Sequence, residues 1–340
     1  MSDRRNPRLL GVKLRTLVAE HLGTPIDADP DSLPNGVALR DGDAAWVIVD
    51  GDAQRSLGAV LAWALRRDAR TLHVVAEVGG GTLARRASAF TTPISVWFAE
   101  ERTLLPVVAE PLAPPPPASA EHLGFTARIA DAGAEPNVEH GVVFGEVRGL
   151  EVCRVVDRPT VGFLAEPGVD PVVSPLADGV QLEVGVGGAD REAFHMLHGE
   201  LPTSEALAAV VATVSRYRSA VDRPHPLNRL GRERLLRWHA VQYPGRIGLA
   251  ELAAAEPPIR RPNLKDPVPC VATGARDNGD RIAVVFSAGV DLDLVPYVAD
   301  VQAMYGIPVI AAVPERDDIA MTRDLAGQLV EPIEFVALDL

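Results

Sequence analysis

The chain has 340 residues, of which 47% are hydrophobic and 23% are charged, a composition typical of a globular protein with two or three domains. Its net charge of −13 opposes non-specific binding of the whole molecule to nucleic acid. No apolar run reaches the roughly 18 to 20 residues that cross a bilayer, and the charged start Met1–Arg8 lacks the apolar core of a signal peptide. We therefore expect a cytoplasmic protein with no membrane association.

The two cysteines, Cys153 and Cys270, have no neighbouring cysteine or histidine. This spacing excludes a zinc knuckle or a disulfide framework. We expect both side chains to be buried as small apolar residues.

Residues 1–112 are expected to form a capped helix followed by a βαβαβ unit. Asn6 and Pro7 precede apolar residues at helical spacing, and Gly23 ends this helix. A polar connection, rich in proline and aspartate, continues to about residue 43. Short apolar strands then alternate with helices, which is typical of a parallel sheet. The strands are expected at 45–49, 71–78 and 94–98, and the helices at 54–67 and 82–90.

A proline-rich linker at 113–120 and a second linker at 254–269 delimit a central α+β segment, 121–253. Within this segment, residues 140–156 are expected to form a hairpin that turns near Arg148 and Gly149, and residues 180–187 an alternating strand. Helices are expected at 190–197 and 203–218.

The C-terminal residues 270–340 repeat the alternation of strands and helices. The strands are expected at 282–286, 308–313 and 333–338, and the helices at 292–304 and 321–329. The last strands of the two units also have similar sequences, TPISVWFAE at 92–100 and EPIEFVALD at 331–339, which suggests an internal duplication. We predict an α/β fold in which two βαβαβ units, each a Rossmann-like half-sheet, flank the central α+β segment.

Four aspartates follow strands of the two βαβαβ units: Asp50, Asp52, Asp291 and Asp293. Ligands of open parallel sheets collect at the carboxyl ends of the strands, and carboxylate oxygens suit Mg²⁺. Aspartate is also a preferred helix cap, because its carboxylate accepts hydrogen bonds from the first helical turn. The sequence leaves both interpretations open, a magnesium site and a pair of helix caps.

A glycine-rich turn, VGGGTLARR at 78–86, lies between a strand and a helix. The backbone amides of Gly79, Gly80 and Gly81, with Arg85 one turn into the helix, suit the phosphate of a nucleotide-like ligand. The turn matches neither the dinucleotide fingerprint nor a Walker loop. Tight strand-to-helix turns also use glycine for backbone reasons alone.

The central segment resembles the core of the PD-(D/E)XK nucleases. Its expected hairpin, third strand and helix carry Glu139, Glu151 and Glu183, and alternation along the strands allows the last two to share a face. The resemblance implies that acids on adjacent strands bind a metal ion. The sequence departs from the family pattern where a lysine is expected, because Gly185 stands two residues after Glu183. Glu151, Glu183 and Asp190 are the catalytic candidates. The alternative interpretation is a half-exposed sheet that carries these acids on its solvent-exposed face.

Residues 216–246 contain eight arginines with aromatic residues between them, a net charge of about +6 in an acidic chain. Arginine and aromatic side chains suit phosphate contact and base stacking. The alternative is an amphipathic helix whose arginines are merely solvated. The nucleic-acid-binding candidates are Arg216, Arg218, Arg229, Arg232, Arg237 and Trp238.

Two functional hypotheses follow. The first is a nucleic-acid-associated protein, a degenerate metal-dependent nuclease with Mg²⁺ at the acidic sites. The second is a non-catalytic module that binds a nucleotide-like ligand or a protein partner at the sheet edges.

Overall fold

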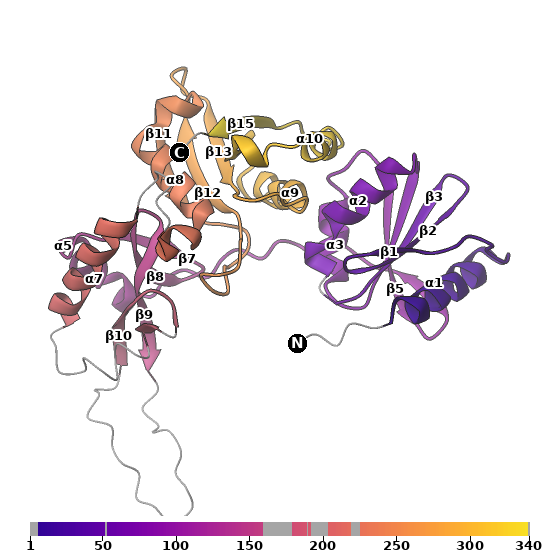
Figure 1. Cartoon of the computed structure of the whole chain (residues 1–340), viewed down its shortest axis with the longest axis horizontal. Coiled ribbons are helices and arrows are strands. Elements are labelled where there is room, and N and C mark those ends of the chain that lie inside the picture. Colours follow the sequence, from indigo (N-terminus) through magenta and orange to yellow (C-terminus); the bar gives the residue numbers. More distant parts are fainter. Residues whose placement is uncertain are drawn as a thin grey trace, which may run out of the picture. The chain divides into compact units, whose positions relative to one another are not determined.

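The structure is a computed structural model that describes residues 6–51, 53–158, 179–188, 190–191, 203–218 and 225–338 (Figure 1). These residues combine helices with three β-sheets, which confirms the general α/β class. Within these ranges, no helix has both the length and the apolar character needed to cross a membrane.

The chain divides into two compact units. Unit 1 contains Met1–Ala113 and Gly279–Asp339, and unit 2 contains Pro114–Asn278 and Leu340. The βαβαβ stretches from the two ends of the chain therefore belong to the same unit. The domain boundaries expected from the sequence stay a prediction.

The N-terminal part of unit 1 is a six-stranded sheet in the order β1-β2-β3-β4-β5-β6. β3 (Ala44–Val49), β4 (Thr71–Ala76) and β5 (Ile94–Glu100) run parallel. α2 (Leu57–Arg66) joins β3 to β4, and α3 (Gly80–Ala87) joins β4 to β5. The strands that pair antiparallel are β1 (Asp31–Leu33), β2 (Gly36–Asp41) and β6 (Thr103–Pro106).

The connection expected between Gly23 and residue 43 instead contains two strands, β1 and β2. Val37 and Leu39 of β2 are 1% exposed and lie opposite Ile48 and Trp46 of β3. The sequence pattern does not predict β2, because proline and aspartate dominate the stretch that contains these two apolar positions.

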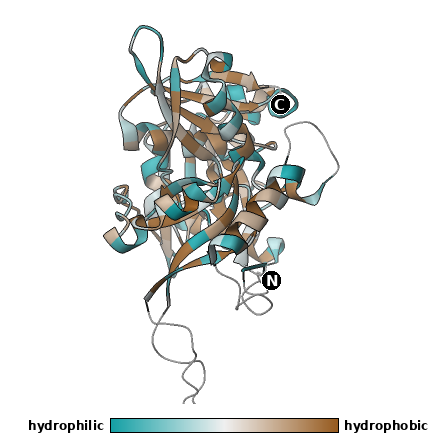
Figure 2. Ribbon diagram, turned by 90° about the vertical axis from the view of Figure 1, so that its left-hand side faces the viewer, coloured by the Kyte–Doolittle hydropathy of each residue, from teal (hydrophilic) through white to brown (hydrophobic). Residues whose placement is uncertain are grey.

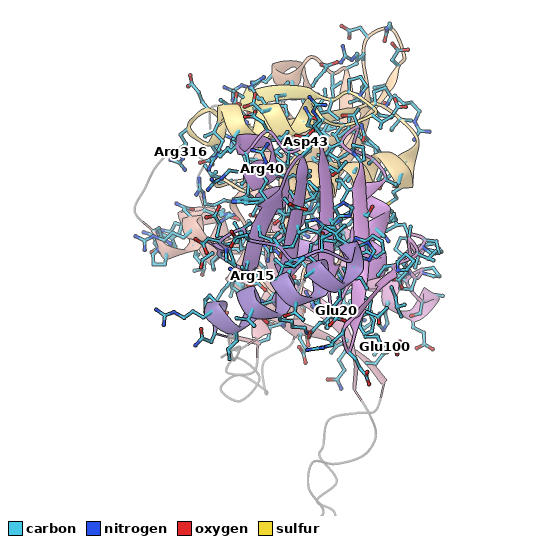
Figure 3. All side chains as sticks on the ribbon, turned by 90° about the vertical axis from the view of Figure 1, so that its right-hand side faces the viewer. Arg15, Glu20, Arg40, Asp43, Glu100 and Arg316 are labelled. Atoms are coloured by element: carbon cyan, nitrogen blue, oxygen red, sulfur yellow. The ribbon has the colours of Figure 1, made fainter. Side chains whose placement is uncertain are left out.

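One face of the six-stranded sheet is covered by α1 (Pro7–Leu22), which crosses in front of the strands in Figure 3. The side chain of Asn6 accepts a hydrogen bond from the N–H of Arg8, and Gly23 ends the helix with a φ of 69°. The apolar stripe of α1 is buried in a core that includes Trp46. The helix expected between Asn6 and Gly23 is therefore confirmed.

The C-terminal part of unit 1 contains three parallel strands joined by two helices. β13 (Arg281–Phe286) pairs with β14 (Val309–Pro314), which pairs with β15 (Glu334–Leu338). α9 (Leu294–Tyr305) and α10 (Ala320–Ala326) make the two connections. Every residue of β14 is buried, which explains its continuous apolar sequence.

The two βαβαβ stretches contact each other through equivalent residues. The N–H of Thr91 donates to the carbonyl of Gln328 (2.7 Å), and the N–H of Val330 donates to the carbonyl of Ala89 (2.8 Å). The same sequence offset separates Thr91 from Val330 and Ala89 from Gln328, so each hydrogen bond is the counterpart of the other. The residues between them form an antiparallel bridge. This contact therefore has approximate two-fold symmetry.

Unit 2 contains a four-stranded antiparallel sheet in the order β10-β9-β8-β7. Its strands are β7 (Glu135–Glu139), β8 (Val142–Val147), β9 (Leu150–Arg158) and β10 (Gly179–Val184). β8 and β9 form the expected hairpin, and Arg148 and Gly149 turn it with φ values of 48° and 73°. Two successive positive φ angles are typical of a type I′ turn.

The helices of unit 2 pack on this sheet and on a second antiparallel pair. α7 (Thr203–Tyr217) shares a core with β9 and β10, and α8 (Arg232–Gln242) contacts β11 (Glu251–Ala255) and β12 (Cys270–Ala275). Two short helices, α4 (Ala120–Leu123) and α5 (Thr126–Asp131), precede β7. Figure 2 shows hydrophobic colour along the strands and polar colour on the outer helix faces.

α2 and α9 of unit 1 approach each other so closely at their first turns that only glycine fits. A Cβ atom at Gly58 would lie 2.2 Å from the carbonyl oxygen of Leu292. We expect Gly58→Ala to lower the free energy of unfolding of unit 1 by about 2 kcal/mol, because two backbones must move apart. Urea denaturation measures this change.

Gly327→Ala is the matched control for this substitution. Gly327 ends α10 with a φ of −64°, and its nearest neighbour to a new Cβ lies at 3.4 Å. We expect this variant to change the free energy of unfolding by less than about 0.5 kcal/mol. Equal effects of the two variants would contradict the close approach at Gly58.

Candidate functional site

Asp291 and Asp293, which follow β13, act as caps within unit 1. The carboxylate of Asp293 accepts a hydrogen bond from the N–H of Gly58 in α2 (2.9 Å), and the carboxylate of Asp291 accepts one from the N–H of Asp293 (2.9 Å). Asp50 donates its N–H to the carbonyl of Asn35 (3.0 Å). Asp52 lies outside the described residues. The turn after β13 therefore caps the helix that follows β3.

Burial, with a contribution from the nearby Asp291, outweighs the hydrogen bond from Gly58 and raises the pKa of Asp293 to about 6. Among the described residues, no group of three or more His, Cys, Asp or Glu side chains is placed to hold a metal ion. For Asp291 and Asp293 the geometry favours the helix-cap interpretation, and the magnesium site stays a prediction.

The glycine-rich turn of unit 1 is covered by the chain itself. Gly79 precedes α3 with a φ of 74°, and the N–H of Glu110 donates to the carbonyl of Gly81 (3.0 Å). A Cβ at Gly81 would lie 2.7 Å from the Cβ of Glu110, and one at Gly80 would lie 3.3 Å from Val107. Residues 107–110 therefore pack against Gly80 and Gly81, and the phosphate site stays a prediction.

Arg85, the charged partner expected for that phosphate, is also engaged. Its Nε donates to a carboxylate oxygen of Asp300 in α9 (3.1 Å), and its Nη1 donates to the carbonyl of Glu110 (2.8 Å). Arg86 donates to the other oxygen of Asp300 (2.8 Å). Because Asp300 is 1% exposed, these contacts hold α3 against α9.

The catalytic candidates of unit 2 are paired with arginines. Glu151 is 1% exposed and accepts hydrogen bonds from Arg154, Arg191 and Arg261. Glu183 lies 3.5 Å from the Nε of Arg191. Glu151 and Glu183 therefore do converge, as the nuclease resemblance expects, but they converge on a guanidinium group.

Asp190, the third catalytic candidate, caps the turn after β10. Its Oδ2 accepts a hydrogen bond from the N–H of Val186 (2.7 Å). This contact is the role that a short acidic side chain ordinarily takes in a turn.

Two further glutamates, absent from the catalytic candidates, form the most buried charged cluster of unit 2. Glu139 and Glu146 lie 7% and 2% exposed against Arg234 and Arg237 of α8. Arg234 donates to both glutamates, and Arg237 contacts Glu139 (3.2 Å) and Glu146 (3.0 Å). Burial raises the pKa of Glu146, but Arg234, Arg237 and Arg261 outweigh it and hold the pKa at about 2.

A cavity of about 10 Å³ lies beside this cluster, lined by Glu139, Glu151, Arg234 and Arg261 among others. This volume is close to the minimum that one water molecule needs. The cavity is therefore too small for a substrate.

Arg218, which follows α7, joins the β8–β9 turn to the segment that precedes α8. It is 0% exposed and donates to the carbonyls of Arg148 (3.2 Å), Leu230 (2.6 Å) and Gly231 (2.8 Å). Burial lowers its pKa to about 10. Arg218 and Arg237 are thus both buried inside unit 2 with partners of their own.

The other residues of the 216–246 segment reach the surface to different extents. Arg216 and Arg229 are exposed, and Arg232 is half-buried and has partners inside unit 2. The Arg216 guanidinium lies 5.4 Å from the ring centre of Tyr217, which stacks on His225 at 4.5 Å.

A row of aromatic and arginine side chains runs from the β8–β9 turn past α8 to the residues that follow this helix. We call it the aromatic–arginine surface, and it consists of Arg148, Trp238, His239, Tyr243 and Arg246. The Arg148 guanidinium lies 5.7 Å from the Trp238 ring, and the His239 ring lies 6.4 Å from Trp238 and 5.1 Å from Tyr243. Arg246 approaches His239 at 3.4 Å. Tyr243 is 57% exposed.

The electrostatics of this surface are set by its neighbours. Burial and the nearby Arg246 lower the pKa of His239, so its ring is neutral at pH 7. The indole N–H of Trp238 donates to Glu135 (2.7 Å), which fixes the orientation of the ring. The permanent positive charges of the surface are therefore Arg246, which is exposed, and Arg148, which is half-buried and also donates to the carbonyl of Arg218.

The cysteines are buried as expected. Burial raises the pKa of both the Cys153 and Cys270 thiols to about 12. Neither thiol is ionised near neutral pH, so neither serves as a nucleophile.

Comparisons of the chain with protein-family models, with curated proteins and with solved structures find no match.

Sequence reasoning missed the pairing of Glu139 and Glu146 with α8. A usable signal was present, because Arg234 and Arg237 are three positions apart and so share a helix face with apolar neighbours. The sequence does not say which strand carries the matching glutamates. Only the order of the strands brings β7 and β8 to α8.

Glu146→Gln tests the buried cluster. The substitution keeps the shape of the side chain but leaves Arg234 and Arg237 with less compensating charge, and breaking a buried pair costs about 3 to 5 kcal/mol. We expect unit 2 to unfold at a clearly lower temperature in scanning calorimetry. Glu251→Gln, at an exposed position of β11, is the control and should leave the transition unchanged. Equal transitions in both variants would contradict the role of the cluster.

Proposed function

We propose that unit 2 binds single-stranded nucleic acid through the aromatic–arginine surface and does not cleave it. The observation that carries this proposal is the alternation of rings and guanidinium groups from Arg148 in the β8–β9 turn, through the half-buried Trp238 and the exposed Tyr243, to the exposed Arg246. Bases stack on aromatic rings whatever their sequence, while arginines contact the phosphates.

The burial of the remaining arginines supports a surface of limited size. Arg234 and Arg237 neutralise glutamates inside unit 2, so the phosphate contacts fall to Arg148 and Arg246, with the exposed Arg216 and Arg229 earlier in the segment. Few phosphate contacts imply modest affinity and a shallow dependence on salt.

The pairing of the acids supports binding without cleavage. Metal-dependent hydrolysis needs carboxylates that are free to coordinate a cation. Glu151 accepts hydrogen bonds from three arginines, and Glu183 shares one of them, Arg191. A metal ion at this point would have to displace bound guanidinium groups.

For unit 1 we propose that the two βαβαβ stretches are Rossmann-like half-sheets that arose by internal duplication. The parallel pairing of β3-β4-β5 and of β13-β14-β15 supports this proposal. The reciprocal hydrogen bonds between Thr91 and Gln328 and between Val330 and Ala89 support it further, because equivalent residues of two copies meet in the same way in a symmetric pair.

The binding proposal is tested with a short fluorescently labelled single-stranded DNA and the equivalent RNA, by anisotropy over a range of salt concentrations. We expect Tyr243→Ala to weaken binding about 10-fold, since one stacked base loses its platform. Arg246→Ala should reduce the slope of log affinity against log salt by about 0.7, the value for one phosphate contact on a single strand.

Arg316→Ala is the matched control, because Arg316 is an exposed arginine of unit 1 (Figure 3). It should leave both affinity and slope unchanged. No binding at low salt, or equal losses in Arg246→Ala and Arg316→Ala, would refute the proposed surface.

A further inference from the structure

The β5–β6 edge of unit 1 carries apolar side chains that nothing in the unit covers. Phe98 and Leu105 lie opposite each other across the two strands and are 42% and 40% exposed. Trp97 and Ala99 pack on the core beneath α1, so alternation along β5 places Phe98 on the opposite face of the sheet.

A cavity of about 300 Å³ lies beside this pair. It is lined by Ala84 of α3, Val96 of β5 and the segment Pro106–Ala109, among others. The N–H of Val107 donates to the carbonyl of Val96 (2.9 Å), so Val96 and Val107 continue the row that Phe98 and Leu105 begin. The cavity and the exposed pair therefore form one groove of mixed polarity whose apolar part is the Phe98–Leu105 pair, and its volume suits a few side chains.

Acidic residues stand at both ends of the groove. Glu100 shares the strand face of Phe98 and lies with Glu101 at one end, where Figure 3 labels Glu100, and Glu110 follows the segment that lines the other end. All three are exposed, and none forms an ion pair with another residue that the structure describes. The nearest basic side chains are already paired, since Arg102 contacts Glu20 and Arg85 contacts Asp300.

We propose that this groove docks an amphipathic, basic segment of a partner protein. Apolar side chains of the partner fill the groove beside Phe98 and Leu105, and its lysines or arginines meet Glu100, Glu101 and Glu110. Apolar burial supplies the affinity, and the two acidic ends select for positive charge and against other apolar peptides.

The probe is a synthetic amphipathic peptide of leucine and arginine, with a scrambled peptide of the same composition that has no apolar face. We expect fluorescence titration of the full chain to show tighter binding of the amphipathic peptide. Phe98→Ser with Leu105→Ser should weaken that binding at least about 10-fold, since two anchors of the groove are removed. Glu100→Arg should weaken it as well, and more so at low salt.

Val12→Ser is the matched control, because Val12 is a 63% exposed apolar residue of α1 in the same unit. It should leave peptide binding unchanged. Circular dichroism shows whether the groove variants fold, and their nucleic-acid binding should match that of the native chain.

Three results would overturn the proposal. Equal binding of the scrambled and amphipathic peptides would reduce the interaction to general attraction between opposite charges. Equal effects of the groove and Val12 variants would remove the groove from the interaction. Self-association of the native chain that Phe98→Ser with Leu105→Ser abolishes would assign the groove to a second copy of the chain.

Discussion

The buried pairing of glutamate with arginine is the constraint on which the rest of unit 2 depends. Glu139 of β7 and Glu146 of β8 meet Arg234 and Arg237 of α8, and all four residues are at least nine-tenths buried. A buried charge without a partner costs several kcal/mol, so α8 is stable on the sheet only where each guanidinium meets a carboxylate. These ion pairs therefore fix the rotation of α8, and with it the outer face that presents Trp238.

Within residues 216–246, the same constraint divides the arginines into buried ones with a structural role and exposed ones that can have a function. Arginines of 216–246 that point inward neutralise glutamates or bind backbone carbonyls, as Arg218 does. Of those that point outward, Arg216 lies beside Tyr217 and Arg246 beside His239. The acids of unit 1 also have a structural role, because Asp293 caps α2 and Asp300 binds Arg85 and Arg86. In both units, charged residues that resemble ligand sites in the sequence hold helices in place.

Local pattern predicted most of the elements and little of their charge pairing. The strands β3, β4 and β5 and the hairpin at Arg148 and Gly149 follow from apolar runs and turn residues, which act over a few positions. The sequence pattern did not predict β1 and β2, because Val37 and Leu39 lie in a polar stretch and their burial depends on β3. The sequence pattern did not predict the partners of Glu151 for a similar reason. Arg261 is distant in sequence, and only the tertiary fold brings its guanidinium within 3.4 Å of the Glu151 carboxylate.

The titration of Glu146 tests the buried ion pairs most directly. Carbon-13 NMR of the glutamate side-chain carboxyl groups, followed as the pH is lowered, reports the protonation of each residue while unit 2 stays folded. We predict that Glu146 remains ionised far into the acid range, with a pKa of about 2, because Arg234, Arg237 and Arg261 outweigh the cost of its burial. A pKa at or above the ordinary value for glutamate, about 4.3, would contradict it.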